Sequence, residues 1–207
     1  FVGNKGWASG LNDRGGVQFL LKAFCEEFRK DEPVELRLKI NTAYCPPGWN
    51  LAEEIRKLGL PDDRAPMLIS TDSVDFKGMP NFYQGDVFVS PSMAEAFSIP
   101  CLEAQACGLP VITTAYGGQT DFVNEQNGWL IPGTMFEVSH DVMYEGIMWK
   151  KPDMDALKKA LRYAYEHPEE CKEKGRKACQ DAQSWTWRES TKKLLSTIYQ
   201  GVDCLKT

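Results

Sequence analysis

Short strand-like runs alternate with helical segments along this chain, and that alternation constrains its fold more than any other feature. Residues 34–40 alternate apolar and charged side chains, as a half-buried strand does, whereas 86–90 and 111–114 are typical of buried strands. Residues 17–29 and 99–107 carry apolar residues at helical spacing. Strands that alternate with helices predict an α/β domain, a doubly wound parallel sheet with helices on both faces.

The remaining segments are shorter or less regular. Residues 1–2 are expected to end a strand before a glycine-rich loop, 3–16, and 133–152 is expected to be an irregular connector. The other predicted elements are strands at 67–70 and 129–131, a helical turn near 80–84, and helices at 50–58, 119–124, 153–166, 168–182 and about 186–201.

Length and composition fit one globular domain. The chain has 207 residues, 43% of them hydrophobic and 26% charged, and a net charge of −5. A chain this long buries about 70% of the surface that its unfolded form exposes, so it needs no disulfide or metal. The acidic balance disfavours general nucleic-acid binding, and no apolar stretch is long enough for a transmembrane segment. The seven cysteines are scattered without a C-x-x-C pair, which favours a reducing, cytoplasmic location.

The strongest functional signal lies within residues 86–132. Ligands of open parallel sheets bind outside the carboxyl ends of the strands. There the loop 92–98 exposes Glu95, and the helix that begins after Ser98 turns its unpaired backbone N–H groups toward this loop, which favours an anion. Glu103, about one turn into that helix, suits neighbouring sugar hydroxyls. The pattern therefore points to a ligand with phosphate, ribose and another sugar.

The same stretch, SPSMAEAFSIPCLEAQACGLPVITT, resembles the signature of the group 1 (family 4) retaining glycosyltransferases. Glu95 and Glu103 are separated by seven residues, as in that family. The resemblance extends from Phe1 to about Trp187, nearly the whole chain. The other matching positions are Pro91, Ser92, Phe97, Ala104, Ala106, Gly108, Pro110, Val111, Gly117, Gly118, Asn127 and Gly128.

The resemblance implies the C-terminal, Rossmann-like half of a GT-B enzyme. Such a domain binds a nucleoside-diphosphate sugar, of UDP or GDP type, and the enzyme, a hexosyltransferase, transfers the sugar with retention of configuration and without a metal or other cofactor. A separate N-terminal domain supplies the acceptor contacts. Because the chain begins at Phe1, inside a predicted strand, we expect residues 1–207 to be the donor-binding domain alone, inactive without its partner domain. The last helix, 186–201, is then expected to pack on that missing domain.

The resemblance also assigns roles to individual residues. Glu95 is implied to contact the transferred sugar near the reacting centre, and Glu103 to hold the ribose hydroxyls. Further donor contacts are implied for the start of the helix, for the glycines before the first helix and for the base-binding loop: Phe97, Ser98, Ile99, Gly15, Gly16 and Met79.

The sequence departs from the family's pattern near its beginning. Asn4 and Gly15 stand where two basic residues are expected. Lys5 and Arg14 each lie one position away, and we expect them to make the catalytic contacts to the leaving diphosphate. Fixed cations aimed at developing negative charge stabilise a transition state by several kcal/mol. Without them catalysis is expected to be badly impaired.

Two further departures lie in the loop that carries Glu95. Ala96 and Ser98 replace glycines of the family. Ala96 has less freedom to adopt positive φ, whereas Ser98 is a good N-cap for the following helix. Cys101, at the start of that helix, is expected to be a small core residue rather than a reactive thiolate.

Two other functions stay open. A non-catalytic module derived from a glycosyltransferase would bind a nucleotide sugar or a glycan without transferring it, which the changes at Asn4 and Gly15 favour. A different α/β enzyme, such as a sugar-nucleotide epimerase or a Rossmann oxidoreductase, would share the fold. The oxidoreductase is disfavoured because no G-x-G-x-x-G follows the first strand.

Overall fold

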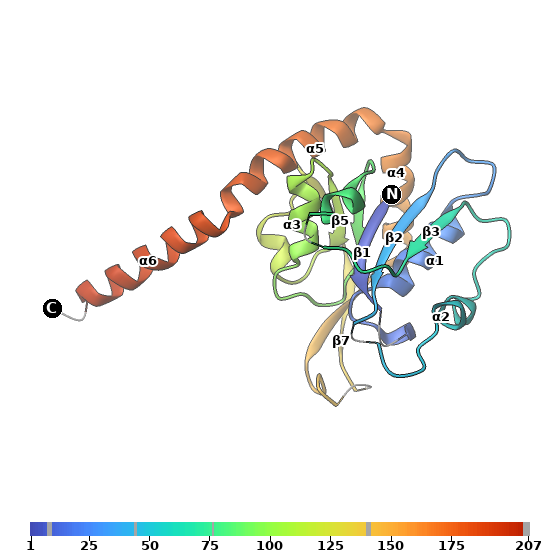
Figure 1. The fold of residues 1–207 in the computed structure, drawn as a ribbon, viewed down its shortest axis with the longest axis horizontal. Coiled ribbons are helices and arrows are strands. Elements are labelled where there is room, and N and C mark those ends of the chain that lie inside the picture. Colours follow the sequence, from blue (N-terminus) through green and yellow to red (C-terminus); the bar gives the residue numbers. More distant parts are fainter. Residues whose placement is uncertain (8–9, 44, 76, 140–141, 205–207) are drawn as a thin grey trace.

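The computed structural model describes residues 1–7, 10–43, 45–75, 77–139 and 142–204. Its strands are β1 (Val2–Gly6), β2 (Leu36–Asn41), β3 (Met67–Ser70), β4 (Phe88–Ser90), β5 (Val111–Thr114) and β6 (Gly128–Ile131). All six are parallel and form one sheet in the order β3-β2-β1-β4-β5-β6 (Figure 1). This order is that of a doubly wound Rossmann-like sheet, so the predicted fold class is confirmed.

Helices cover the two faces of the sheet. On one face, α1 (Val17–Glu27) and α4 (Met154–Glu166) pack against each other and over the inward side chains of β2. On the other, α3 (Ile99–Ala106) covers β4 and β5, and α5 (Pro168–Ala182) packs on α3. We call these the α1 face and the α3 face. The shorter helices are η1 (Gly10–Asn12), α2 (Leu51–Lys57), η2 (Met79–Tyr83), η3 (Gly118–Asp121) and η4 (Gln183–Trp185).

The first strand is longer than predicted. β1 runs to Gly6, so the glycine-rich loop begins at Trp7 rather than at Gly3. A Cβ at Gly3 would lie 3.0 Å from the side chains of Leu20 and Leu38, so a glycine here lets α1 approach the sheet closely. Because side chains alternate along a strand, neighbouring residues of β1 face opposite sides of the sheet. That alternation decides what Asn4 and Lys5 contact in the site.

The connector 133–152, which was expected to be irregular, contains a β-hairpin. β7 (Gly133–Glu137) pairs antiparallel with β8 (Met148–Pro152), and the hairpin projects from the carboxyl ends of the sheet strands (Figure 1). Trp149 is buried against Met93 and Val138, and its neighbour Lys150 donates its backbone N–H to the Met93 carbonyl, 2.9 Å away. Contacts to the Met93 loop, rather than a strong strand pattern, fix this hairpin.

The last helix extends away from the rest of the domain (Figure 1). α6 (Trp187–Cys204) has exposed side chains throughout residues 187–199, including Trp187 at 86% exposure and Tyr199 at 66%. Leu194, Leu195 and Ile198 are exposed as well. The expected packing of this helix on a second domain stays a prediction.

One glycine sets how closely the loops after β1 and β4 approach. Gly16, just before α1, has φ of +80°, and a Cβ there would lie 2.1 Å from the Pro91 carbonyl oxygen. Gly48 has the same φ of +80°, but nothing lies within 4 Å of its added Cβ. A comparison of alanine variants at the two positions therefore distinguishes the cost of backbone strain, which both share, from the cost of a steric clash, which only Gly16 has.

We predict that Gly16→Ala destabilises the domain far more than Gly48→Ala. The left-handed backbone alone costs alanine about 1 kcal/mol at either position after the gain in unfolded-state entropy. The contact with Pro91 raises the cost of Gly16→Ala to about 3 kcal/mol or more. Urea denaturation of both variants measures the difference, and equal losses of stability would show that the loops do not meet as described.

Candidate functional site

The candidate site lies where the strand order reverses, between β1 and β4. Parallel sheets of this type form a ligand crevice at that place, outside the carboxyl ends of the strands. The two loops are joined directly, since the Met93 backbone N–H donates to the Arg14 carbonyl at 2.8 Å. Ser92 Oγ also lies 3.3 Å from the Gly15 carbonyl oxygen. The crevice is therefore formed by chain segments far apart in sequence.

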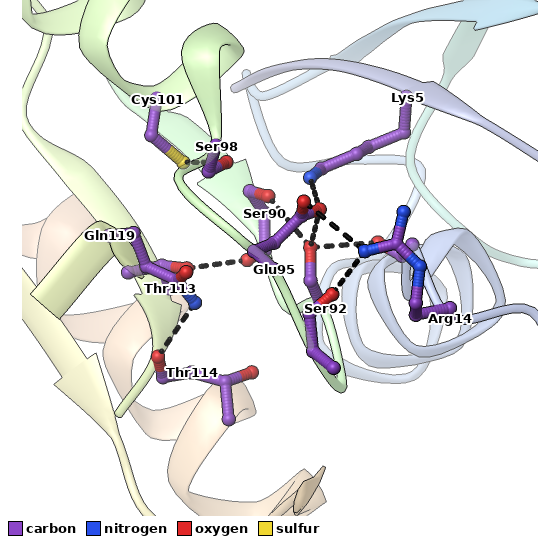
Figure 2. A network of polar contacts seen from close by, with 12 residues as sticks. Lys5, Arg14, Ser90, Ser92, Glu95, Ser98, Cys101, Thr113, Thr114 and Gln119 are labelled. Carbon is purple, nitrogen blue, oxygen red and sulfur yellow. Dashed lines mark hydrogen bonds and ion pairs between the residues drawn. The ribbon is translucent and has the colours of Figure 1, made fainter. Parts of the chain in front are cut away.

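Glu95 lies at the centre of a cluster of charged and polar side chains (Figure 2). Lys5 Nζ forms an ion pair with Glu95 Oε1, and Arg14 Nη1 lies 3.3 Å from Oε2. Arg14 Nη1 also donates to the Ala94 carbonyl, and Ser92 Oγ donates to Oε1 at 3.0 Å. The side chains of Lys5 and Glu95 are only 8% and 13% exposed, against 38% for Arg14. The structure thus brings together the three residues expected to be catalytic.

These contacts keep Glu95 ionised. Burial by itself raises the pKa of this carboxyl, but the charge and hydrogen bond of Lys5, the charge of Arg14 and the Ser92 hydroxyl together outweigh it. The pKa of Glu95 therefore lies below its usual value. The carboxylate thus lies between two cations, at a place that stabilises an anion.

The start of α3 has an unusual backbone. Ser98 adopts the left-handed region, with φ of 68°, and is the only described non-glycine residue with positive φ. It precedes the helix, but its hydroxyl makes no N-cap bond and donates instead to Cys101 Sγ at 3.2 Å. Ser98 is at the N-cap position, as expected, but its side chain does not cap the helix, because a capping side chain usually goes with an extended backbone. Positive φ, which was expected to be restricted at Ala96, occurs instead at Ser98, the second position where the family has glycine.

The backbone N–H groups of Phe97, Ser98 and Ile99 lie at the start of α3. Within the described part of the chain, none of the three donates a hydrogen bond to a protein acceptor. They belong to the positive end of the α3 dipole, next to the Lys5–Glu95–Arg14 cluster. Cys101, inside the same helix, is fully buried, and burial raises the pKa of its thiol. It is a core residue, as expected.

The Gly117-Gly118 loop after β5 supports the loop that carries Glu95. The Gly118 N–H donates to the Glu95 carbonyl at 3.0 Å, and a Cβ at Gly118 would lie 2.0 Å from the Ala96 carbonyl oxygen. Only a glycine allows this approach. The glycine pair of the motif therefore holds the backbone of the site loop, which its sequence position alone does not reveal.

Tyr83, which the sequence motif does not mark, holds Glu103 in place, and Asn4 supports Tyr83. Tyr83, in η2, donates its hydroxyl to Glu103 Oε2, and Asn4 Nδ2 donates to the Tyr83 hydroxyl at 3.2 Å. Burial, and then the bond to Glu103, raise the pKa of Tyr83, so the phenol stays protonated and donating. Asn4, at an expected basic position, thus faces the α3 face, whereas Lys5 carries the positive charge to Glu95. A one-residue shift along β1 separates the two roles.

The remaining predicted donor residues lie around this crevice. The Gly15 N–H donates to Asp13 Oδ1 at 2.8 Å and the Gly16 N–H to the Asp13 carbonyl at 3.2 Å, so both are engaged within their own loop. Met79 begins η2 and packs, partly buried, against the cluster around Tyr83. Their contacts with a donor stay predictions.

Two further features of the described residues bear on ligands and location. No group of three or more histidine, cysteine, aspartate and glutamate side chains among them is arranged to hold a metal ion. None of their helices is long and apolar enough to cross a membrane.

A sequence profile described as "Glycosyl transferases group 1" matches residues 4–143. The chain belongs to this family. The matched range includes Lys5, Arg14, Glu95, Tyr83 and Glu103, and the resemblance inferred from the motif is confirmed.

Curated relatives of this family member are much longer than the chain. The D-inositol 3-phosphate glycosyltransferase of Saccharomonospora viridis is 32% identical over 189 residues, which cover 87% of this chain and 38% of the relative. Sucrose-phosphate synthase 4 of Arabidopsis thaliana is 30% identical over 91 residues, which cover 42% of this chain and 8% of that protein. The chain thus spans less than half the length of these relatives.

Solved glycosyltransferase structures share the fold. Sucrose-phosphate synthase from Thermosynechococcus elongatus superposes with a TM-score of 0.65 at 21% identity, covering 99% of this chain and 46% of that one. Anabaena HepE in complex with UDP-glucose gives a TM-score of 0.63 at 18% identity, covering 95% of this chain and 48% of that one. At these identities the likeness is one of fold alone.

We predict that Glu95→Gln lowers stability at pH 7 by about 2–3 kcal/mol, because Lys5 then stays buried without a counter-charge. Since the pKa of Glu95 is lowered in the folded state, its contribution is present above the unfolded value, about 4.5, and is lost as pH falls through the folded value. The variant should therefore lose less stability than the wild type as pH falls below about 4.5. Denaturation at several pH values measures this.

Glu169→Gln is the matched control, because Glu169 pairs with Lys172 on the exposed surface of α5. Its effect at pH 7 should not be measurable. A loss at Glu95 no larger than at Glu169 would contradict the buried cluster.

Tyr83→Phe should destabilise the domain by about 1–2 kcal/mol, because it leaves Asn4 and Glu103 without their common partner. The exposed Tyr163, whose hydroxyl donates to Glu170 at 2.7 Å, offers the same chemistry at the surface. Tyr163→Phe should have no measurable effect. Thermal unfolding of both variants tests the difference, and equal effects would place Tyr83 outside the support of Glu103.

Proposed function

We propose that this domain binds a nucleoside-diphosphate sugar and serves a retaining glycosyltransferase as its donor-binding half. One observation carries the proposal. Lys5, near the end of β1, and Arg14, in the following loop, converge on Glu95 beside three N–H groups at the start of α3 that have no acceptor among the described residues. Membership of the group 1 glycosyltransferases supports the reaction class.

The diphosphate binds where Glu95 now holds the two cations. A phosphate group carries more negative charge and more acceptor oxygens than a carboxylate, so it competes well for Lys5 and Arg14. The N–H groups of Phe97, Ser98 and Ile99 complete the anion site, and their dipoles need no reorganisation during the reaction. These donors and cations stabilise the charge that develops on the leaving diphosphate.

Glu95 positions the transferred sugar. Once the diphosphate takes over Lys5 and Arg14, the carboxylate is released toward the sugar hydroxyls. Its low pKa keeps it a hydrogen-bond acceptor. The side chains bonded to Glu95 are Lys5, Arg14 and Ser92, two cations and a hydroxyl, which suit a group that positions the sugar. This favours a front-face reaction, in which the leaving diphosphate helps to deprotonate the acceptor.

Glu103 binds the ribose. Tyr83 engages Oε2, which leaves Oε1 to accept from a ribose hydroxyl and fixes the carboxylate in advance. Met79 and its neighbours in the loop before η2 contact the base. HepE, a structural neighbour, is in complex with UDP-glucose, which supports UDP as the first nucleotide to test and GDP as the second.

Three parts of the proposal concern the whole protein. Donor binding needs no metal, because Lys5, Arg14 and the α3 start supply the positive charge. An additional domain supplies acceptor contacts, which accords with the chain spanning about half of the neighbouring structures. The exposed side of α6 packs on that domain, so the chain by itself transfers little or no sugar. The scattered cysteines also predict a cytoplasmic location for the protein.

Calorimetric titration of the chain with UDP, GDP and ADP, first with EDTA and then with Mg²⁺, tests the proposal. We expect one nucleotide to bind equally well under both conditions. Glu103→Ala should weaken its binding by about tenfold or more, since a hydrogen bond to a charged group is worth about 1.5–3 kcal/mol. Glu173→Ala, at an exposed position of α5, is the control and should bind as the wild type does.

The outcomes separate the alternatives. Absence of binding to any nucleotide, or binding unchanged in Glu103→Ala, would overturn the assignment. Binding that depends on Mg²⁺ would overturn the metal-free site. The position of Asn4 favours a second candidate, a non-catalytic binding module, because Asn4 is turned to Tyr83 and offers no charge to a phosphate. Sugar transfer by the protein with its acceptor domain, lost in Lys5→Met, would exclude that candidate.

A further inference from the structure

A further cavity lies on the α3 face of the sheet, beside the Lys5–Arg14–Glu95 cluster but lined by other residues. Its volume is about 320 Å³, at the lower end of the range of small-molecule sites. It lies over β2 and β3 and beside η2. Its lining includes Arg37, Lys39, Leu68, Ser70, Asn81 and Phe82.

Lys39 is the unusual residue of this cavity. It is only 8% exposed, and among the described residues no carboxylate lies within ion-pair distance of it. Its Nζ lies 5.5 Å from the centre of the Phe82 ring, a cation–π contact. A buried ammonium without a counter-charge is costly. The cavity therefore contains a cation that an anion would stabilise.

A second cation flanks the first. Arg37 lies two residues before Lys39 on β2, so both side chains are on the same face of the sheet. Arg37 forms an ion pair from Nε to Glu35 Oε1 at 2.5 Å, and among the described residues its guanidinium makes no other hydrogen bond. The hydroxyl of Ser70 and the amide of Asn81 add hydrogen-bonding groups to the lining.

The rest of the lining is apolar. Leu68, opposite Arg37 in the β2–β3 register, is 55% exposed although it belongs to a sheet strand. The ring of Phe82 forms a second apolar wall. Short η2 covers β1 but leaves this part of β2 and β3 open. A ligand that covered Leu68 and Phe82 would gain hydrophobic stabilisation in addition to its charge contacts.

We propose that this cavity binds a small organic anion, a phosphate or carboxylate group on a compact, flat apolar body. Lys39 and Arg37 hold the anionic group, and Leu68 and Phe82 hold the body. The site is distinct from the Lys5–Arg14–Glu95 cluster, because its cations lie on β2 and face the α3 side of the sheet. It adjoins the support of Glu103, since η2 supplies Tyr83 to that carboxylate and Asn81 and Phe82 to the cavity. The proposal does not depend on the proposed function.

Phenyl phosphate and benzoate are the probes, titrated into the isotopically labelled chain and followed by amide chemical shifts. The two probes distinguish a phosphate from a carboxylate ligand. We expect at least one of them to shift the amides of Ser70 and Asn81 at millimolar concentration. An equal amount of UDP present during the titration should leave the affinity unchanged.

Variants then test the cation. Lys39→Met should weaken binding of the probe by about tenfold or more, and Lys39→Arg should retain it, because the charge is kept. Lys30→Met, at an exposed position after α1, is the control and should bind as the wild type does.

Three results would overturn the proposal. They are absence of amide shifts at Ser70 and Asn81 with both probes, binding that survives Lys39→Met unchanged, and competition between the probe and UDP, which would assign the cavity to the donor. The first result is obtained on the unaltered chain, so it does not depend on how Lys39→Met folds. The first two results do not bear on whether UDP binds at Glu103, so failure of this proposal can be distinguished from failure of the proposed function.

Discussion

The contact between Lys5 and Glu95 joins the two halves of the sheet at the place where the strand order reverses. Lys5 lies next to the last residue of β1 and Glu95 follows β4, and both side chains are nearly buried. Neither charge would be tolerated there alone. Each therefore fixes the other, and Arg14 and Ser92 add to the same carboxylate. The arrangement of the crevice follows from this requirement, because the loops after β1 and β4 must meet for the charges to be paired.

Close backbone contacts hold the cluster in place. Gly16 lies against the Pro91 carbonyl and Gly118 against the Ala96 carbonyl, at distances that no side chain would allow. Ser98 then adopts a left-handed backbone where the family has glycine, at a cost of about 1–2 kcal/mol. Strain of this kind persists where the surroundings determine the conformation, and it is common at functional sites. In this domain it precedes the first N–H groups of α3, which have no hydrogen-bond acceptor in the described part of the chain.

Much of this was predictable from the sequence, because apolar periodicity and the glutamate motif are local signals. The strands at 67–70 and 111–114 and the doubly wound sheet follow from them. The extension of β1 to Gly6 was missed, since glycine usually disfavours strands and the close approach of α1 that favours Gly3 is a tertiary contact. The β7–β8 hairpin and the Asn4–Tyr83–Glu103 chain depend likewise on contacts between distant segments. The sequence suggested that the Ser98 side chain caps α3, because serine favours that role, but its left-handed backbone is not that of a capping residue.

The central claim is that Glu95 occupies an anion site which a nucleoside diphosphate takes over. Carbon-13 NMR of the Glu95 carboxyl, titrated with pH in the free chain and in the chain saturated with the nucleotide that binds it, tests this most directly. In the free chain the pKa of Glu95 should lie below its usual value. With nucleotide bound it should rise, because the diphosphate engages Lys5 and Arg14 and adds negative charge nearby. A pKa of Glu95 that stays equally low in the saturated complex would contradict the account.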